Sequence, residues 1–334
     1  MLLVTTFQAR SRALAPGVAA TLVVAAAATY FAAHFRAPPM LLALLFGIWM
    51  NFLMTPNCKP GIEFAARDLL RVGVALLGTR ITFEQIVHLG WHPIVLVIVS
   101  VVATILFSAV VARLVGFNTL FGFLTGGATA ICGASAALAL SASLPAHPAK
   151  ETATAFTILG ASVASMLAMI AYPILAHQLD LSAVASGVFI GGSIHEVAHV
   201  VGAGYSISRE TGDIATIVKL MRVAMLVPVI VFAAIVTRRA QGGAAPAERP
   251  PLLPWFAVAF LLLAWINSIG WIGSTMQSFT NDVSRWCLII AMSAIGMKTQ
   301  LKQIVAVGLK PVLLMLGEAV FLAALVLCLS RWLT

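Results

Sequence analysis

Apolar runs long enough to cross a lipid bilayer recur along the whole chain. A transmembrane helix needs about 20 mostly apolar residues, and we find about eleven such segments. Only 9% of the residues are charged, against roughly 25% in soluble domains, which excludes a water-soluble surface. The runs are continuous, whereas barrel strands in membranes alternate apolar and polar residues. These features predict an all-α polytopic membrane protein.

The predicted segments lie at residues 16–34, 39–56, 61–79, 93–115, 119–143, 152–176, 181–203, 213–237, 252–272, 283–298 and 311–332. Arg10 and Arg12 precede the first, which lacks a clean cleavage site after small residues. We therefore expect a retained membrane helix rather than a removed signal peptide. The predicted parts are the N-terminal segment with the first helix over 1–36, a first bundle over 37–237, a linker over 238–251 and a second membrane part over 252–334.

Basic residues lie singly between the apolar runs. The net charge of +9 thus reflects membrane topology rather than nucleic-acid binding. The linker-like stretch 238–251, the loop near 298–310 and the N-terminus fall on one side of the membrane, and that side holds more Lys and Arg. Because cytoplasmic loops carry this excess, we expect a cytoplasmic N-terminus and an outside C-terminus.

An internal repeat joins two distant parts of the chain. Residues 76–96 and 294–314 align without a gap, and the first copy's Gly78, Gln85, Ile86, Val87, Gly90, Pro93 and Leu96 recur as Gly296, Gln303, Ile304, Val305, Gly308, Pro311 and Leu314. The second copy is shifted by seven predicted segments from the first, an odd number, so the copies cross the membrane in opposite directions. Inverted repeats of this kind, with discontinuous helices, are typical of secondary transporters.

Two segments contain Gly-Gly in mid-membrane followed by small polar residues. Such a helix break frees backbone N–H groups, which bind anions at the start of the second half-helix. The candidate substrate-binding residues in the two stretches are Gly126, Gly127, Thr129, Cys132, Gly133, Ser135, Gly191, Gly192 and Ser193. Close helix packing through small residues is the alternative explanation.

Ionisable residues inside membrane segments are costly and are therefore candidates for function. Lys219 and Arg222 lie three residues apart, on one helical face, and we include them as counter-charges to a bound anion. Snorkelling of both side chains to the membrane surface is the alternative. For Glu318 and the Asn267-Ser268 pair, function and helix–helix hydrogen bonding stay equally open.

His195, Glu196 and His199 form an H-E-x-x-H sequence. On a helix this pattern holds Zn²⁺ with two His on one face and uses the Glu as general base. A catalytic zinc site needs a third protein ligand, and no later buried Asp supplies one. The four cysteines lack C-x-x-C spacing. We therefore expect no metal, cofactor or enzymatic activity, and keep an intramembrane zinc metalloprotease as the alternative.

Several of these motifs resemble one family. The stretches "GGATAICGASAALA", "GGSIHEVAHVVGAG", "VKLMRVAMLVPV" and "AMSAIGMKTQLKQIVAVGLKPV" are similar to those of the YeiH-type family, bacterial inner-membrane proteins named as sulfate exporters. The resemblance extends from about Pro38 to the C-terminus. It implies an inverted-repeat fold with discontinuous crossing helices. The residues that match the family's two signatures are Thr129, Cys132, Gly133, Ser135, Ser193, His195 and Glu196.

The family usually has Gln where this chain has His199, so one substitution completes the H-E-x-x-H sequence. We expect a secondary transporter that exports a small anion, such as sulfate or another sulfur-containing anion, at the expense of an ion gradient. Because histidine changes charge near neutral pH, His195, Glu196 and His199 are the predicted coupling residues. The expected partners are the anion and the lipid bilayer, without nucleic acid, and homo-oligomerisation stays open. A channel is a weaker option.

Overall fold

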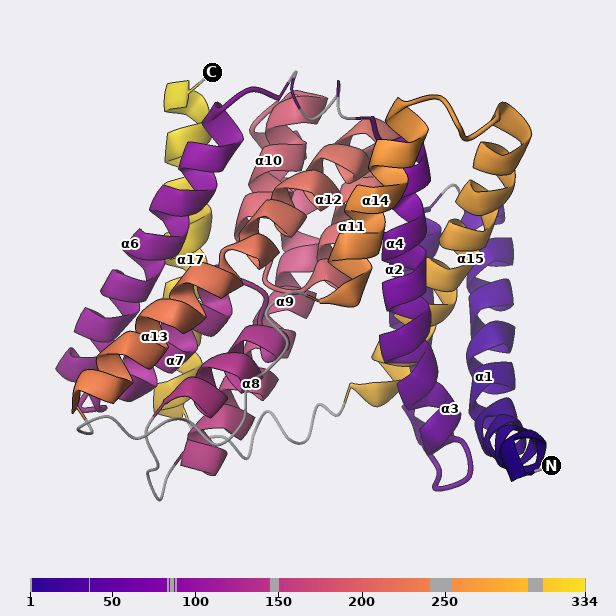
Figure 1. The fold of residues 1–334 in the computed structure, drawn as a ribbon, viewed down its shortest axis with the longest axis horizontal. Helices are drawn as coiled ribbons and strands as arrows, with labels where there is room; N and C mark the ends of the chain where they lie inside the picture. The colour runs from indigo at the N-terminus through magenta and orange to yellow at the C-terminus, as the bar shows by residue number, and fades with distance from the viewer. Residues whose placement is uncertain are drawn as a thin grey trace. The chain divides into compact units, whose positions relative to one another are not determined.

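The structure is a computed structural model that describes residues 2–35, 37–82, 84, 87, 89–144, 150–240, 254–299 and 309–333. Every regular element in these ranges is helical (Figure 1), which confirms the all-α prediction. The elements before residue 90 are α1 (Leu2–Phe35), α2 (Pro39–Trp49), η1 (Asn51–Leu53), α3 (Lys59–Phe64), η2 (Ala65–Leu69), α4 (Leu70–Leu77) and η3 (Gly78–Arg80). Those that follow are α6 (His92–Leu114), α7 (Thr119–Ala130), α8 (Ala134–Ser143), α9 (Lys150–Gln178), α10 (Ala183–Ser193), α11 (Val197–Ile207), α12 (Arg209–Ala224), α13 (Leu226–Ala240), α14 (Trp255–Ser268), α15 (Ser274–Lys298) and α17 (Leu309–Leu333).

Each predicted segment corresponds to a helix or to consecutive helices. In the described residues, five helices are long and apolar enough to span a membrane: Arg12–Phe35, His92–Leu114, Lys150–Gln178, Arg209–Ala233 and Val312–Arg331. Other segments consist of shorter apolar helices, because two of them are broken in the middle: 119–143 forms α7 and α8, and 181–203 forms α10 and α11. The predicted linker over 238–251 lies mostly outside the described residues.

Contacts divide the chain into two compact units. The first contains α1 to α4, α14 and α15, and the second contains α6 to α13 and α17. In the first unit, glycines let helix backbones approach closely. A Cβ added to Gly17 of α1 would lie 2.7 Å from the Cα of Gly61 in α3, and one added to Gly47 of α2 would lie 2.9 Å from the Cα of Gly296 in α15. Small residues make such tight contacts possible in membranes.

The elements that flank the repeat run in opposite directions within each unit. In the first unit, Ser284 Oγ of α15 donates to the carbonyl of Gly73, while the earlier residue Gln277 donates to the carbonyl of Thr79. The chain thus ascends α4 and descends α15 (Figure 1). An inverted repeat requires that α4 and α15 run in opposite directions, as they do here. The middle of the second copy, residues 300–308, lies outside the described residues.

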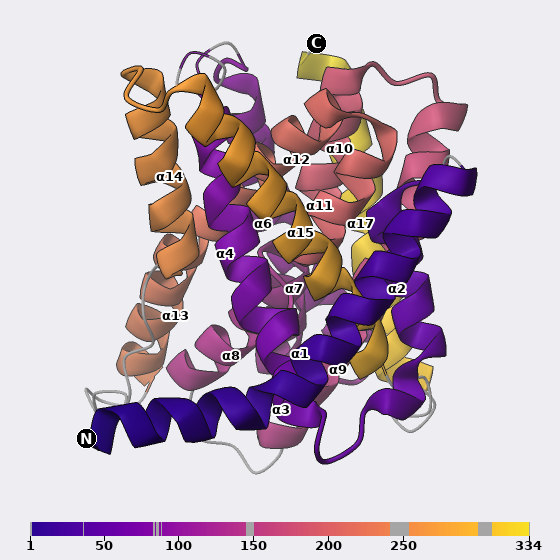
Figure 2. The same ribbon diagram turned by 90° about the vertical axis from the view of Figure 1, so that its right-hand side faces the viewer.

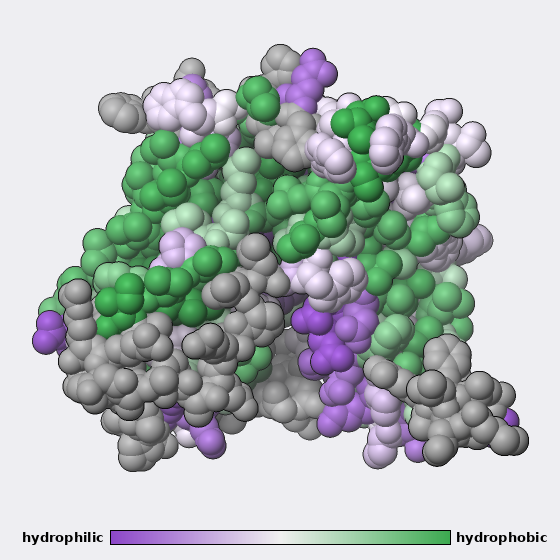
Figure 3. Space-filling view, in the orientation of Figure 1, coloured by the Kyte–Doolittle hydropathy of each residue, from purple (hydrophilic) through white to green (hydrophobic). Residues whose placement is uncertain are grey.

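The second unit shows the same reversal in α6 and α17. Leu96 at the start of α6 and Val326 late in α17 both flank Gly192. Further along α6, Ser108 instead contacts Glu318, which comes earlier in α17. The two helices are therefore antiparallel. Figure 3 shows apolar side chains over the outer face of α6, where Leu106 and Val110 are among the exposed large residues. Such a face suits lipid.

Two helix breaks lie within the second unit. Between α7 and α8, Gly133 has a φ of 62°, a conformation that favours glycine and turns the chain sharply. Between α10 and α11, Ile194 and Glu196 have extended backbone with ψ angles of 139° and 138°. Helix α12 packs against both α10 and α11, and the three helices lie side by side in Figures 1 and 2. The breaks place their freed backbone groups beside α12.

Candidate functional site

Arg222 joins the two broken helices from the neighbouring helix α12. Its side chain is fully buried. Nε donates to the carbonyl of Ala130, Nη2 donates to those of Ala130 and Thr129, at 2.9 Å for Thr129, and Nη1 donates to those of Gly191 and Ile194 at 3.3 and 3.0 Å. A guanidinium group has five N–H donors, and all of them are used here. Arg222 therefore satisfies the carbonyls at the ends of α7 and α10.

Lys219, one helical turn earlier, does the same with fewer bonds. Its buried ammonium group donates to the carbonyl of Ile131 at 2.7 Å and to that of Ile194 at 2.9 Å. These acceptors belong to different breaks. An ammonium group has three donors, so one N–H of a charged Lys219 has no acceptor among the described residues. The two predicted cations thus point into the breaks, and the snorkelling alternative does not hold.

The electrostatics of the breaks follows from these bonds. The C-terminal end of a helix carries a partial negative charge and its N-terminal end a partial positive charge. Lys219 and Arg222 neutralise the negative ends of α7 and α10. The positive ends of α8 and α11 begin at Ala134 and Val197, directly after the breaks. Freed N–H groups at such ends bind anions.

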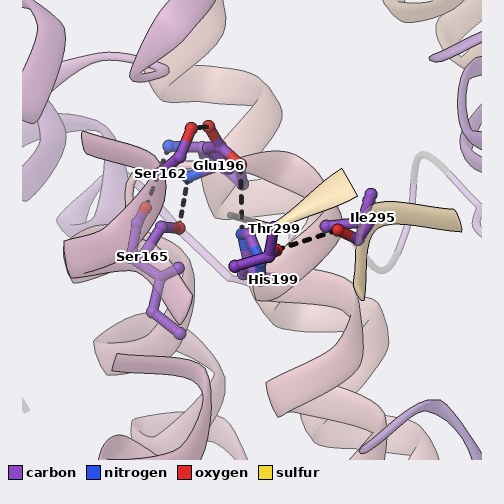
Figure 4. Close-up of polar contacts among 8 residues, drawn as sticks. Ser162, Ser165, Glu196, His199, Ile295 and Thr299 are labelled. Atoms are coloured by element: carbon purple, nitrogen blue, oxygen red, sulfur yellow. Dashed lines mark hydrogen bonds and ion pairs between the residues drawn. The ribbon is translucent and has the colours of Figure 1, made fainter. Parts of the chain in front are cut away.

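Glu196 supplies the carboxylate of the second break. Ser162 Oγ of α9 donates to its Oε1 at 2.6 Å, and its backbone N–H donates to Ser165 Oγ at 3.0 Å (Figure 4). His199 Nδ1 lies 3.2 Å from Oε2, within ion-pair distance but without hydrogen-bond geometry. A Cβ on Gly133 would lie 3.2 Å from the Glu196 Cγ. The carboxylate side chain therefore adjoins both breaks.

His195 also bridges the breaks. Its Nδ1 lies 3.1 Å from the carbonyl oxygen of Thr129, and because a carbonyl only accepts, this nitrogen is the donor. The other ring nitrogen, Nε2, is buried and has no hydrogen-bond partner among the described residues; the same holds for Nε2 of His199. Buried polar atoms without a partner are rare and call for an explanation such as a ligand.

The H-E-x-x-H sequence does not form a helical pair of histidines. Helix α11 begins at Val197, so His195 lies in the break and His199 lies in the helix. His195 turns to Thr129, and His199 turns to Glu196. In the described part of the chain, no group of three His, Cys, Asp or Glu side chains could hold a metal ion. The geometry that a zinc protease takes from this motif is thus not present.

The remaining predicted residues lie around the breaks in different roles. Gly126 and Gly127 pack against Ser108 and Leu140, while Gly191 and Gly192 pack against α12 and α17. Ser193 Oγ donates to a carbonyl of its own helix, one turn earlier. Cys132 is buried within the first break, and Ser135 is exposed. The structure therefore brings Thr129, Gly133, His195, Glu196, His199, Lys219 and Arg222 together.

Ser162 and Ser165 are site residues that sequence reasoning missed. They lie three residues apart on α9, which places them on one face of that helix. Two hydroxyls at this spacing in an apolar helix are a weak signal, because Ser often bonds within its own helix. Only the position of α9 beside α11 shows that they reach Glu196.

Comparison with known proteins defines the family. The family model described as Conserved hypothetical protein 698 matches residues 16–315. The chain is 49% identical to the UPF0324 membrane protein CT0845 of Chlorobaculum tepidum, over 96% of this chain and 90% of that protein. It is 48% identical to the UPF0324 membrane protein TauZ of Paracoccus pantotrophus, over 93% of each. No solved structure matches the chain.

The chain therefore belongs to the UPF0324 family of membrane proteins. The relatives confirm the resemblance to the YeiH-type family that the break motifs indicated. They also agree with the several membrane-capable helices of the structure, so the chain is a multi-pass membrane protein.

Proposed function

We propose that the protein is a secondary transporter that binds a small anion at the two helix breaks. The observation that carries this proposal is the burial of two basic side chains, Lys219 and Arg222, at the breaks. Lys219 and Arg222 contribute two cations, and Glu196 is the carboxylate that adjoins the breaks. The four half-helix ends cancel in pairs, since two are negative and two are positive. With Lys219 and Arg222 charged and with His195, His199 and Glu318 neutral, one positive charge remains.

The donors for an anion are present at the same place. Lys219 has one N–H left, and the N-terminal ends of α8 and α11 offer backbone N–H groups. Nε2 of His195 is buried and without a partner among the described residues, but it is not one of these donors, because a neutral imidazole that donates from Nδ1 can only accept at Nε2. A singly charged anion would balance the surplus. Arg222 sets up this site through the backbone, because all of its donors already bind carbonyls.

Sulfur-containing anions are the first substrate class to test, and the resemblance to sulfate exporters makes export the direction to test. We assign coupling to His195, Glu196 and His199, since they connect the breaks through groups that can change charge. The lipid bilayer is the expected surrounding. A channel does not couple anion flux to a second gradient. Anion flux against its own concentration gradient would therefore exclude a channel.

The test is a thermal-stabilisation screen of purified protein against sulfate, sulfite, thiosulfate, small sulfonates and carboxylates, followed by flux in proteoliposomes. Anions that stabilise wild-type protein should fail to stabilise Lys219→Met. The matched control is Lys150→Met, because Lys150 also donates to a helix-end carbonyl, that of Leu144, but lies away from the breaks. Equal stabilisation of wild type and Lys219→Met would contradict the proposal.

A further inference from the structure

Glu318 lies in the interior of the second unit and is held by three hydroxyl groups. Its side chain is fully buried on α17. Ser108 Oγ of α6 lies 2.5 Å and Thr125 Oγ1 of α7 lies 2.7 Å from Oε1, while Thr129 Oγ1 of α7 lies 2.8 Å from Oε2. Its described partners are thus all uncharged. An ionised carboxylate in such a place would be buried without a counter-charge, which is costly.

The hydroxyl protons are too few for the contacts around an ionised Glu318. Ser108 Oγ also lies 2.6 Å from the carbonyl oxygen of Gly122. Together with the three contacts of the carboxyl, this makes four oxygen–oxygen contacts of 2.5–2.8 Å, each of which needs one proton between its atoms. Thr125 Oγ1 also has three longer contacts, at 3.1–3.3 Å, with Ser108 Oγ and the carbonyl oxygens of Phe121 and Gly122, which are left out of this count. Ser108, Thr125 and Thr129 supply only three protons, because each hydroxyl has one and a carbonyl has none.

A proton on Glu318 resolves this count. Ser108 then donates to Gly122, the carboxylic acid donates from Oε1 to Ser108, Thr125 donates to Oε1, and Thr129 donates to Oε2. All four contacts are satisfied. From this geometry we propose that Glu318 carries a proton in this conformation and is a further proton-binding group of the transporter, beside the coupling residues His195, Glu196 and His199.

Other charges are not placed to take over this role. The helices packed against α17 are α6, α7, α9 and α10, and α7 and α10 have no titratable side chains. Those of α6 and α9 are His92, Arg113, Lys150, Glu151, Tyr172 and His177. None of them contacts the Glu318 carboxyl within the described ranges. Arg222 and His195 are linked to it indirectly, through the backbone of Thr129.

Thr129 connects the carboxyl to the breaks. Its hydroxyl contacts Glu318, and its carbonyl accepts from Arg222 and His195. Loss of the proton from Glu318 adds a negative charge beside the breaks and cancels the surplus positive charge there. This step of the inference rests on the proposed anion site. Proton and anion then increase each other's affinity by the same factor.

Infrared spectroscopy of the purified protein tests the proton directly. We expect a carboxylic-acid C=O band at neutral pH that shifts in D₂O and is lost in Glu318→Gln. The amide can donate to Ser108 and accept from Thr129, so this variant should keep its fold. Glu151→Gln is the matched control, since Glu151 is exposed, and it should keep the band. A band that persists in Glu318→Gln, or a wild-type protein without one, overturns the inference.

Ser108→Ala keeps the test decisive should Glu318→Gln fail to fold. Removal of the acceptor of the acid proton should shift the band to higher frequency. An unshifted band overturns the assignment.

Anion affinity is measured in parallel with the thermal-shift screen over a pH series. If the band is present and no anion binds, the proposed function fails and the protonated Glu318 stands. If an anion binds with an affinity independent of pH while the band is absent, the anion site stands and the proton inference fails.

Discussion

The two helix breaks share their cations but differ in what they expose. The break between α7 and α8 is made by the backbone: Gly133 turns the chain with a positive φ, and no ionisable carboxyl or imidazole lies within it. The break between α10 and α11 is made of extended residues that carry His195 and Glu196. Lys219 binds carbonyls of both. One break therefore contributes backbone groups, and the other contributes titratable side chains.

The difference shows how a membrane protein can build one site from two unlike halves. Backbone N–H groups bind an anion at any pH, because they do not titrate. An imidazole or a carboxylate responds to pH. If the proposed function is correct, the α7–α8 break provides affinity and the α10–α11 break provides control. The variants below separate the two contributions.

Substitution of Arg222 should lower the stability of the protein more than the other variants, because Arg222 binds carbonyls of both breaks. Arg222→Ala leaves the carbonyls of Ala130 and Gly191 without their donor and removes one of the two donors of the Thr129 carbonyl. An unpaired buried polar group costs about 1–3 kcal/mol, so we expect a much lower unfolding temperature in detergent. Arg222→Lys keeps the charge with three donors and should be intermediate. An unchanged unfolding temperature in Arg222→Ala would show that these bonds do not hold the breaks.

Gly133→Ala should damage the α7–α8 break alone. The backbone of Gly133, with a φ of 62° and a ψ of −122°, is sparsely populated by residues with a Cβ and costs them about 1–3 kcal/mol. The new methyl group would also lie 3.2 Å from the Glu196 Cγ. The matched control is Gly116→Ala, which has a φ of 92° and nothing within 4 Å of the added Cβ. Both should lose similar stability in denaturant titrations, but only Gly133→Ala should lose anion-induced stabilisation. If anions stabilised Gly133→Ala and Gly116→Ala equally, Gly133 would not be part of the anion site.

Glu196→Gln should change the α10–α11 break without unfolding it. Ser162 can still donate to the amide oxygen in place of Oε1. The surplus positive charge at the breaks increases by one, so we expect anion binding to tighten by about tenfold, which corresponds to 1.4 kcal/mol. Isothermal titration at low ionic strength measures it. Weaker binding in Glu196→Gln would indicate that the carboxylate itself contacts the substrate.

Zinc should have no measurable effect. We expect less than stoichiometric zinc in purified protein by elemental analysis, and no change in that value in His199→Gln. The reason is that His195 and His199 have different partners, Thr129 and Glu196. One zinc per chain that disappears in His199→Gln would favour the metalloprotease alternative.

The helices and the two broken segments were predictable from local patterns. Apolar length located each segment, and Gly-Gly in mid-membrane indicated which two segments break. The Gly-Gly pairs themselves lie within α7 and α10, and the chain breaks a few residues later, before Ala134 and Val197. Local patterns place the ends of helices less well. Helix α15 begins at Ser274, well before the apolar run that starts at residue 283, because its polar first turns also form helix.

Long-range partners were not predictable, because hydropathy contains no information on which helices meet. Lys219 and Arg222 were recognised as unusual cations, yet their acceptors are backbone carbonyls, which every residue has. Glu318 was noticed as a buried acid, but its hydroxyl partners come from α6 and α7, about 200 residues earlier. Which helices make up each unit was not predictable for the same reason, since each unit combines distant parts of the chain.

The bonds of α12 to both breaks have a mechanical consequence. Lys219 and Arg222 each bind carbonyls of the first break and of the second. Separation of α7 from α10 would expose two buried cations and their acceptors together, at a cost of several kcal/mol. Lys219 and Arg222 therefore hold α7, α10 and α12 together. In a transport cycle that exposes the breaks first to one side of the membrane and then to the other, we expect α7, α10 and α12 to move as one rigid block. The hinges of that motion would then lie outside these three helices.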